Sequence, residues 1–278
     1  MLTPLTFTIA DISVTLQWRP PISGVTAPPA YQSFLTKRAK DICLELSTGE
    51  PQHGEEIPVF DSAPIWSLYR VKSGSLFHLF DSYPDLKRTL FLPDEGGSAR
   101  LSFHAADRNP FVGPALELLL ITHLARCDGV ILHGCGISLN GLGIVFAGES
   151  GAGKSTLSRL LAREKGAEIL SDDRVIVRRQ NASFYLYGTP WHGEETFAAP
   201  GGVELSRLFF IRHGQGNDIR KLSAAGAVRE MLKCSFPPLW DAGGMAAALE
   251  LFHSVATSVP CAELSFVPDS RVADFVMP

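Results

Sequence analysis

The sequence has few cysteines, no large surplus of either charge and no long hydrophobic run. Its five cysteines are scattered and form no C-x-x-C pair, so we expect reduced thiols rather than a zinc site or a disulfide framework. A net charge of -4 argues against a general affinity for nucleic acid or anionic membranes. The longest apolar run, around residues 115–122, is too short to span a bilayer.

The amino-terminal residues, Met1–Thr6, also lack the features of a targeting segment. They have neither a basic stretch nor the apolar core that is typical of secretion signals. We therefore expect a soluble, cytoplasmic protein that has no nucleic-acid or membrane partner.

The strongest motif is a P-loop, the glycine-rich turn that wraps phosphate groups with backbone N–H groups. Residues 148–155 read G-x-x-x-x-G-K-S. Glycines allow the backbone to approach phosphate oxygens closely, the lysine reaches the β- and γ-phosphates, and the serine hydroxyl can ligate Mg²⁺. The predicted nucleotide-binding set is therefore Gly148, Glu149, Ser150, Gly151, Ala152, Gly153, Lys154, Ser155 and the following Thr156.

The sequence around the motif has the expected context. The apolar run Ile144–Ala147 predicts a buried strand before the loop, and residues 156–165 have helical spacing with Gly166 at the carboxyl end. The dipeptide Asn140-Gly141 between two apolar runs predicts a hairpin. The strand that enters the P-loop should therefore pair antiparallel with its predecessor.

An acidic pair, Asp172-Asp173, follows the next predicted strand, 18 residues after Lys154. If that strand runs parallel to the P-loop strand, the pair lies beside the loop. One carboxylate can hold Mg²⁺ and the other can accept a proton from an attacking hydroxyl. Mutual repulsion should raise the pKa of one of them. A solvated turn is the alternative reading of an Asp-Asp pair.

Two histidines are further candidates for the site. His133 precedes the predicted hairpin, and His192 lies in the turn-rich Gly188–Glu195 segment. The other histidines, His213 among them, have no motif around them. Arg174, Arg212, Arg220 and Lys221 are candidates for phosphate or substrate contacts, with surface charge as the simpler explanation of each.

The remaining chain divides into two predicted parts. Residues 1–110 are β-rich, with hairpin turns expected near residues 10–11, 72–75 and 94–97. This module has no catalytic pattern and suits substrate docking or oligomerisation. Residues 111–278 form the predicted P-loop catalytic domain. It contains helices expected at residues 114–126, 224–234 and 242–255, and strands expected at 130–138, 175–177, 184–187, 208–211 and 262–266.

The motifs together resemble a known family. Leu132–Gly134, Asn140–Gly143, the P-loop and Leu170–Val175 match the carboxyl-terminal catalytic domain of HPr kinase/phosphorylase in order and spacing. The resemblance implies an α/β, phosphoenolpyruvate-carboxykinase-like P-loop fold with a mixed sheet. It also implies that Asp172 is the general base, that His133 lies near the transferred phosphoryl group and that Lys154 is catalytic. Ser155 and Asp173 would organise the metal.

The chain also departs from the bacterial enzyme. Thr156 stands where that enzyme typically has Glu, and the stretch Leu186–His192 replaces its characteristic Ile-Arg-Gly-Leu-Gly-Ile segment. The Gly188–Gly193 stretch more closely resembles HPr-kinase-related proteins, some of which resemble kinases that modify ribosomally made peptides. A protein or peptide serine is therefore the expected acceptor.

The expected activity is ATP- and Mg²⁺-dependent phosphoryl transfer to a hydroxyl. Two alternatives remain at this point: a regulatory nucleotide-binding ATPase without transfer, and a kinase for a small molecule such as free serine. The related bacterial kinases form homo-oligomers, so the resemblance also leaves a homo-oligomer open.

Overall fold

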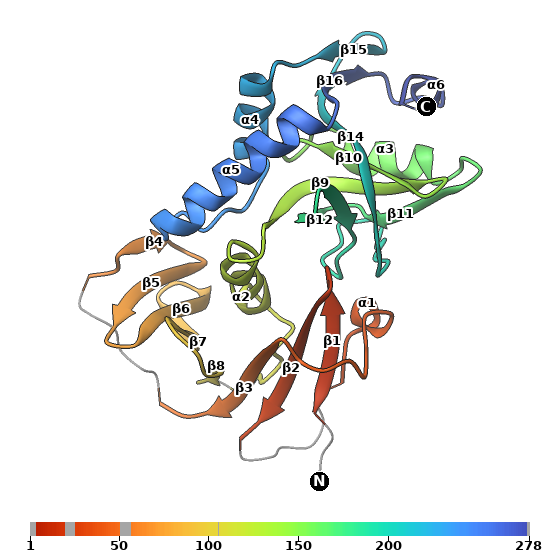
Figure 1. The fold of residues 1–278 in the computed structure, drawn as a ribbon. Helices are drawn as coiled ribbons and strands as arrows, with labels where there is room; N and C mark the ends of the chain where they lie inside the picture. The colour runs from red at the N-terminus through yellow and green to blue at the C-terminus, as the bar shows by residue number, and fades with distance from the viewer. Residues whose placement is uncertain (1–3, 20–25, 51–56, 105, 277–278) are drawn as a thin grey trace. The chain divides into compact units, whose positions relative to one another are not determined.

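The computed structural model describes residues 4–19, 26–50, 57–104 and 106–276. The chain is a mixed α/β protein with two eight-stranded sheets (Figure 1), and it separates into two compact units, residues 1–120 and 121–278. The roles predicted for the two parts stay predictions.

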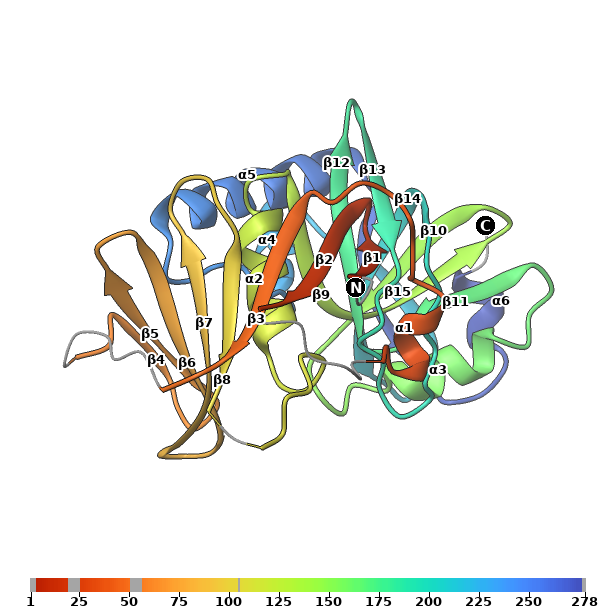
Figure 2. The ribbon, with the colours of Figure 1, turned by 90° about the horizontal axis from the view of Figure 1, so that it is seen from below.

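The sheet of the first unit contains strands β1 to β8, which Figure 2 shows side by side. Pairing is antiparallel except where β3 pairs parallel with β2 and with β8. The hairpins predicted near residues 10–11, 72–75 and 94–97 are confirmed. In spatial order the strands are β1 (Leu5–Ile9), β2 (Ile12–Trp18), β3 (Ile42–Thr48), β8 (Ala99–Phe103), β7 (Asp85–Pro93), β6 (Gly74–Ser82), β5 (Trp66–Val71) and β4 (Phe60–Ser62); helix α1 is Pro29–Gln32.

The sheet of the second unit is built around the long strand β9 (Gly129–Leu139). Strand β10 (Leu142–Ala147) pairs antiparallel with β9 and parallel with β14 (Gly202–His213). The strands β10, β9, β12, β13 and β14 therefore close into a ring of pairings. The other strands are β11 (Ala167–Ser171), which pairs with β9, β12 (Arg174–Gln180), β13 (Ser183–Tyr187), β15 (Asp218–Lys221) and β16 (Cys261–Phe266).

Helices cover both faces of this second sheet. Along β10, Val145 and Ala147 belong to one apolar cluster and Ile144 and Phe146 to another, because successive side chains of a strand point to opposite faces. Helices α4 (Ala224–Lys233) and α5 (Ala242–Ser258) contribute to the first cluster. Helices α3 (Lys154–Leu161) and α6 (Val272–Val276) contribute to the second.

Local sequence explains most of these elements. Asn140 and Gly141 have φ angles of 50° and 84°, which confirms the predicted hairpin between β9 and β10. Helix α2 (Ala115–Leu124), α4 and α5 confirm the three predicted helices. Strand β14 begins earlier than the apolar run 208–211 predicted, because its first half is held by pairing with β13. No helix within the described residues is long and apolar enough to cross a membrane.

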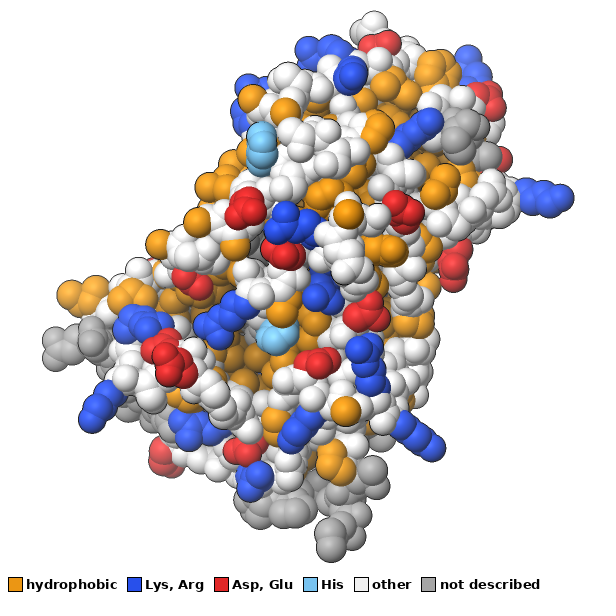
Figure 3. Space-filling view, viewed as in Figure 1, with side chains coloured by type: hydrophobic (Ala, Val, Ile, Leu, Met, Phe, Trp, Pro, Cys, Tyr) orange, Lys and Arg blue, Asp and Glu red, His pale blue; other side chains and the backbone are white. Residues whose placement is uncertain are grey.

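The charged surface agrees with the nearly balanced composition. On the face drawn in Figure 3, Lys and Arg side chains alternate with Asp and Glu side chains rather than forming a broad area of one sign.

Candidate functional site

The P-loop has the predicted strand, loop and helix. Strand β10 ends at Ala147 and α3 begins at Lys154. Gly151 and Gly153 have φ angles of 81° and 99°, in the left-handed region that favours glycine. A Cβ atom on Gly148 would lie 2.8 Å from Ile211 Cγ1. The loop thus combines close backbone packing with the N-terminal end of a helix, an arrangement that suits a phosphate group.

Lys154 is held inside this loop. The residue is only 7% exposed, and Nζ donates hydrogen bonds of 3.0 Å to the carbonyl oxygens of Gly148 and Glu149. Burial lowers the pKa of Lys154, and the nearby carboxylate of Asp173 opposes that shift. Burying a charged lysine costs free energy of folding. Such a cost is typical of a residue that binds an anion rather than of one that stabilises the fold.

Strand β9 positions the P-loop and the acidic pair on its two edges. The amide of Gly148 bonds the carbonyl oxygen of His133 at 3.4 Å, and the amide of Gly134 bonds the carbonyl oxygen of Asp173 at 2.9 Å. Neighbouring strands of a sheet lie about 5 Å apart, so β9 separates the P-loop from the acidic turn by roughly 10 Å. Strand β9 lies between β10 and β11 and pairs antiparallel with both, so β10 and β11 run in the same direction, as the sequence argument assumed.

Asp173 faces the site and is held at both oxygens. His133 Nε2 lies 3.2 Å from Oδ1, and an Arg174 guanidinium nitrogen lies 3.1 Å from Oδ2. Burial raises the pKa of Asp173, but the hydrogen bond from His133 and the charges of Arg174 and Lys154 outweigh burial, so the pKa lies below its usual value. The carboxylate repulsion expected from the sequence therefore does not raise the pKa of this residue.

The lowered pKa of Asp173 predicts a pH dependence of stability. A carboxyl group with a lowered folded-state pKa contributes stability that is fully present above its unfolded pKa, near 3.8, and is lost as the pH falls through the folded-state pKa. Urea unfolding of wild type and Asp173→Asn can be measured between about pH 5 and pH 2. The difference between their free energies of unfolding should shrink as the pH falls. A difference that does not change with pH would contradict this assignment.

Asp172 has a different environment from its neighbour. The residue is 1% exposed, and its two oxygens accept hydrogen bonds from the backbone amides of Gly193 at 2.9 Å and Glu195 at 3.0 Å. His192 lies in the same loop, where its Nδ1 is 3.0 Å from the carbonyl oxygen of Gly193. The structure therefore places His133 beside Asp173, and His192 in the loop that bonds to Asp172.

Sequence reasoning missed one residue at the P-loop, His213. Its Nε2 lies 2.8 Å from the carbonyl oxygen of Gly151. The residue ends β14, and the parallel pairing of β14 with β10 brings that end beside the loop. No short motif could indicate this contact, because the two segments are 62 residues apart.

The other basic candidates have acidic partners or lie at the surface. Arg212 contacts the buried Glu230 and lies 3.6 Å from Glu263, and Arg220 lies 3.0 Å from Glu263. Lys221 is exposed at the end of β15. Arg174, which contacts Asp173, is the one of the four that meets an expected site residue.

The residues suit a magnesium ion that is shared with phosphate groups. Within the part of the chain that the structure describes, no group of three or more His, Cys, Asp or Glu side chains is arranged to hold a metal ion. Ser155 lies in the first turn of α3, next to Lys154. Magnesium commonly takes one or two protein oxygens and completes its shell with phosphate and water, so a hydroxyl and one carboxylate form a suitable donor set.

Gly153 offers a direct test of the loop conformation. Its φ is 99°, and a Cβ atom added there would lie 2.9 Å from Phe266 Cζ. Alanine at this position is therefore expected to lower the free energy of unfolding by about 1–3 kcal/mol and to weaken nucleotide binding. Gly216→Ala is the matched control, because nothing lies within 4 Å of its Cβ position. Equal melting temperatures and equal ATP affinities for the two variants would contradict the required loop geometry.

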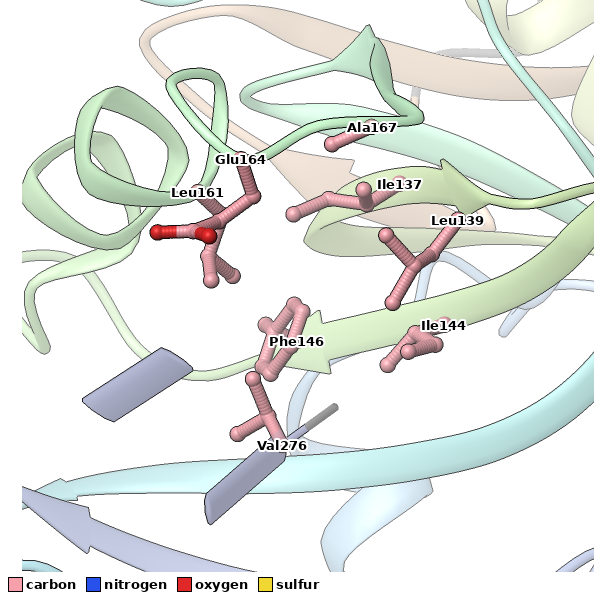
Figure 4. Close-up of a pocket in the computed structure, with 8 residues that line it drawn as sticks. All are labelled: Ile137, Leu139, Ile144, Phe146, Leu161, Glu164, Ala167 and Val276. Atoms are coloured by element: carbon pink, nitrogen blue, oxygen red, sulfur yellow. The ribbon is translucent and has the colours of Figure 1, made fainter. Parts of the chain in front are cut away.

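A separate pocket lies at the other end of the P-loop helix. Figure 4 shows it lined by side chains of β9, β10, β11, α3 and α6 and by Glu164, the one charged residue of this lining, which lies just after α3. Its lining is Ile137, Leu139, Ile144, Phe146, Leu161, Glu164, Ala167 and Val276. The P-loop, His133 and the acidic pair contribute nothing to this lining, so the pocket is distinct from the candidate site.

Comparison with known proteins agrees with the motifs over part of the chain. The HPr kinase/phosphorylase of Lacticaseibacillus casei is 34% identical over 99 residues, which is 36% of this chain and 27% of that protein. The HPr kinase/phosphorylase of Shouchella clausii is 31% identical over 113 residues, 40% of this chain and 32% of that protein. Over this region, the chain is similar to HPr kinase/phosphorylases. The resemblance that the motifs indicate is thereby confirmed.

The similarity is partial in extent. The chain spans about a quarter to a third of the length of the curated relatives it matches. It matches no family model. The solved structure of the Hpr(Ser) kinase/phosphatase from Coxiella burnetii is 12% identical, with a TM-score of 0.30, and the match covers 52% of this chain and 90% of that one.

Proposed function

We propose that the protein is an ATP- and Mg²⁺-dependent kinase that transfers the γ-phosphoryl group to a hydroxyl, with a serine of a peptide or protein as acceptor. The observation that carries this proposal is the arrangement around β9, where the P-loop bonds to one edge of the strand and the acidic turn to the other. In-line phosphoryl transfer needs the donor phosphates and the group that orients the attacking hydroxyl to be held in fixed positions, and β9 holds the two loops that would supply them.

The donor side uses the P-loop and Lys154. The loop amides and the N-terminus of α3 would hold the phosphates, and Lys154 would exchange its bonds with Gly148 and Glu149 for bonds with phosphate oxygens. Ser155 would hold Mg²⁺ together with these phosphates. Magnesium, when bound, would neutralise the negative charge that develops on the phosphate groups during transfer.

The acceptor side uses Asp173 and His133. Asp173 is partly exposed and both of its oxygens contact side chains, whereas Asp172 is 1% exposed and both of its oxygens bond to backbone amides. The geometry therefore favours Asp173 as the group that accepts the hydroxyl proton, in place of Asp172, to which the family resemblance assigns this role. His133 and Arg174 would orient the Asp173 carboxylate and keep it ionised.

The preference for a peptide or protein acceptor is supported by the named relatives and by the Gly188–Gly193 segment. The β-sheet of the first unit is proposed to dock that acceptor or a second copy of the chain. A transfer assay with Mg²⁺ and γ-labelled ATP tests the proposal: label should move to serine-containing peptides and not to peptides in which alanine replaces serine. Label that moves to free serine instead would identify a small-molecule kinase.

A further inference from the structure

The segment 188–199 makes hydrogen bonds to three residues of the acidic turn, Ser171, Asp172 and Arg174. Ser171 Oγ donates to the carbonyl oxygen of Trp191 at 3.2 Å, and Thr189 Oγ1 donates to the carbonyl oxygen of Arg174 at 2.6 Å. Between these contacts, the Asp172 carboxylate accepts hydrogen bonds from the backbone amides of Gly193 and Glu195. The turn from Ser171 to Arg174 is therefore covered on one side by a single continuous loop.

The same segment is also tied to the P-loop helix. Glu195 Oε1 lies 3.2 Å from Arg159 Nε, and Arg159 belongs to α3. At its ends, the amide of Ala199 bonds the carbonyl oxygen of Leu170 at 2.9 Å, and a Cβ atom on Gly188 would lie 2.1 Å from the carbonyl oxygen of Ala199. The segment therefore links the nucleotide half of the site to the acidic half.

The chemistry of Asp172 fits the task of holding this loop. Two N–H donors, two residues apart, converge on the side chain, and only a carboxylate offers two acceptor oxygens and no donor. A buried carboxylate needs such donors, and it has both oxygens satisfied by backbone amides. An asparagine in its place would keep one acceptor but turn an NH₂ group toward one of the two amides.

We propose that the segment 188–199 forms the surface that binds the acceptor peptide, and that Asp172 positions this segment. The loop packs against Asp173, because a Cβ atom on Gly193 would lie 3.5 Å from Asp173 Cβ, so residues that flank a serine bound at Asp173 would lie beside it. The loop offers Trp191 and His192, both partly exposed, and the exposed Glu194 for contacts with residues that flank the acceptor serine. This inference rests on the proposed kinase function for the identity of the acceptor.

Hydrogen exchange tests the positioning step without any substrate. In Asp172→Asn, amides of the segment 188–199 should exchange about 5- to 150-fold faster than in wild type, the fold-change that corresponds to one lost buried hydrogen bond. Glu195→Gln, which keeps its amide but loses the charge that faces Arg159, should show a smaller increase. Asp218→Asn, on the exposed strand β15, is the control. Unchanged exchange in Asp172→Asn would overturn the proposal.

Kinetics test the acceptor-binding step. With the serine-containing peptides as acceptor, Asp172→Asn and Glu195→Gln should raise the KM for peptide and leave the KM for ATP near its wild-type value. A loss of kcat at unchanged peptide KM would overturn the proposal and make Asp172 a proton acceptor. If the wild-type protein transfers no phosphate at all, the kinase proposal fails, whereas faster exchange of the loop in Asp172→Asn still supports the positioning role.

Discussion

Replacing Asp173 by asparagine is expected to lower the rate of phosphoryl transfer by about 10²- to 10⁴-fold, the usual contribution of a positioned general base. Asparagine has nearly the same shape and keeps one acceptor oxygen for His133 or Arg174, but it cannot accept a proton at neutral pH. ATP binding should persist, because the P-loop is unchanged. Single-turnover transfer measured beside ATP titration separates the two effects.

Asp172→Asn is the matched comparison for this result. It makes the same chemical change one residue away, at a carboxylate that is 1% exposed. We expect transfer by Asp172→Asn to recover at high peptide concentration, and transfer by Asp173→Asn to stay low at every concentration. The opposite pattern would contradict the assignment of Asp173 and support the role that the family resemblance gives to Asp172.

Replacing Lys154 by methionine is expected to weaken ATP binding by about 10- to 150-fold, which corresponds to the loss of a charge-assisted hydrogen bond to phosphate. Saturating ATP and Mg²⁺ should raise the melting temperature of wild type, because a ligand that binds the folded state stabilises it. The variant should lose most of that increase at the same nucleotide concentration. Lys165→Met, at an exposed lysine just after α3, is the control.

The same variant should be no less stable than wild type without nucleotide. Burial lowers the pKa of Lys154, so the folded state gains stability as the pH rises through that lowered pKa, and at neutral pH it bears the cost of a buried charge. Methionine fills a similar volume without that cost. A variant that melts well below wild type yet retains full ATP affinity would show that Lys154 is a structural residue.

Local signals in the sequence were sufficient to predict the strand, loop and helix of the proposed donor side. The G-x-x-x-x-G-K-S spacing and the apolar run before it predicted β10, the loop and α3, and Asn140-Gly141 predicted the hairpin with β9. These features depend on residues that are neighbours in the chain, so turn chemistry and periodicity are enough to find them.

The acceptor half depends on contacts between distant segments. Asp172 and Asp173 are adjacent and chemically identical in the sequence, and the amides that distinguish them belong to residues 193 and 195. The parallel pairing of β10 with β14, which brings His213 to the P-loop, joins segments that are far apart in the chain. Periodicity does not indicate which strands become partners, and for this reason the contacts of these residues emerge only from the fold.

The most direct test of the central claim is one transfer experiment. The wild-type protein is incubated with γ-labelled ATP, Mg²⁺ and a serine-containing peptide library, beside a library in which alanine replaces serine, and labelled peptide and free phosphate are both quantified. The proposed function predicts labelled serine peptides, no label in the alanine library and a strong reduction in Lys154→Met. ATP turnover that releases only free phosphate with either library would contradict it and identify a nucleotide-hydrolysing module instead.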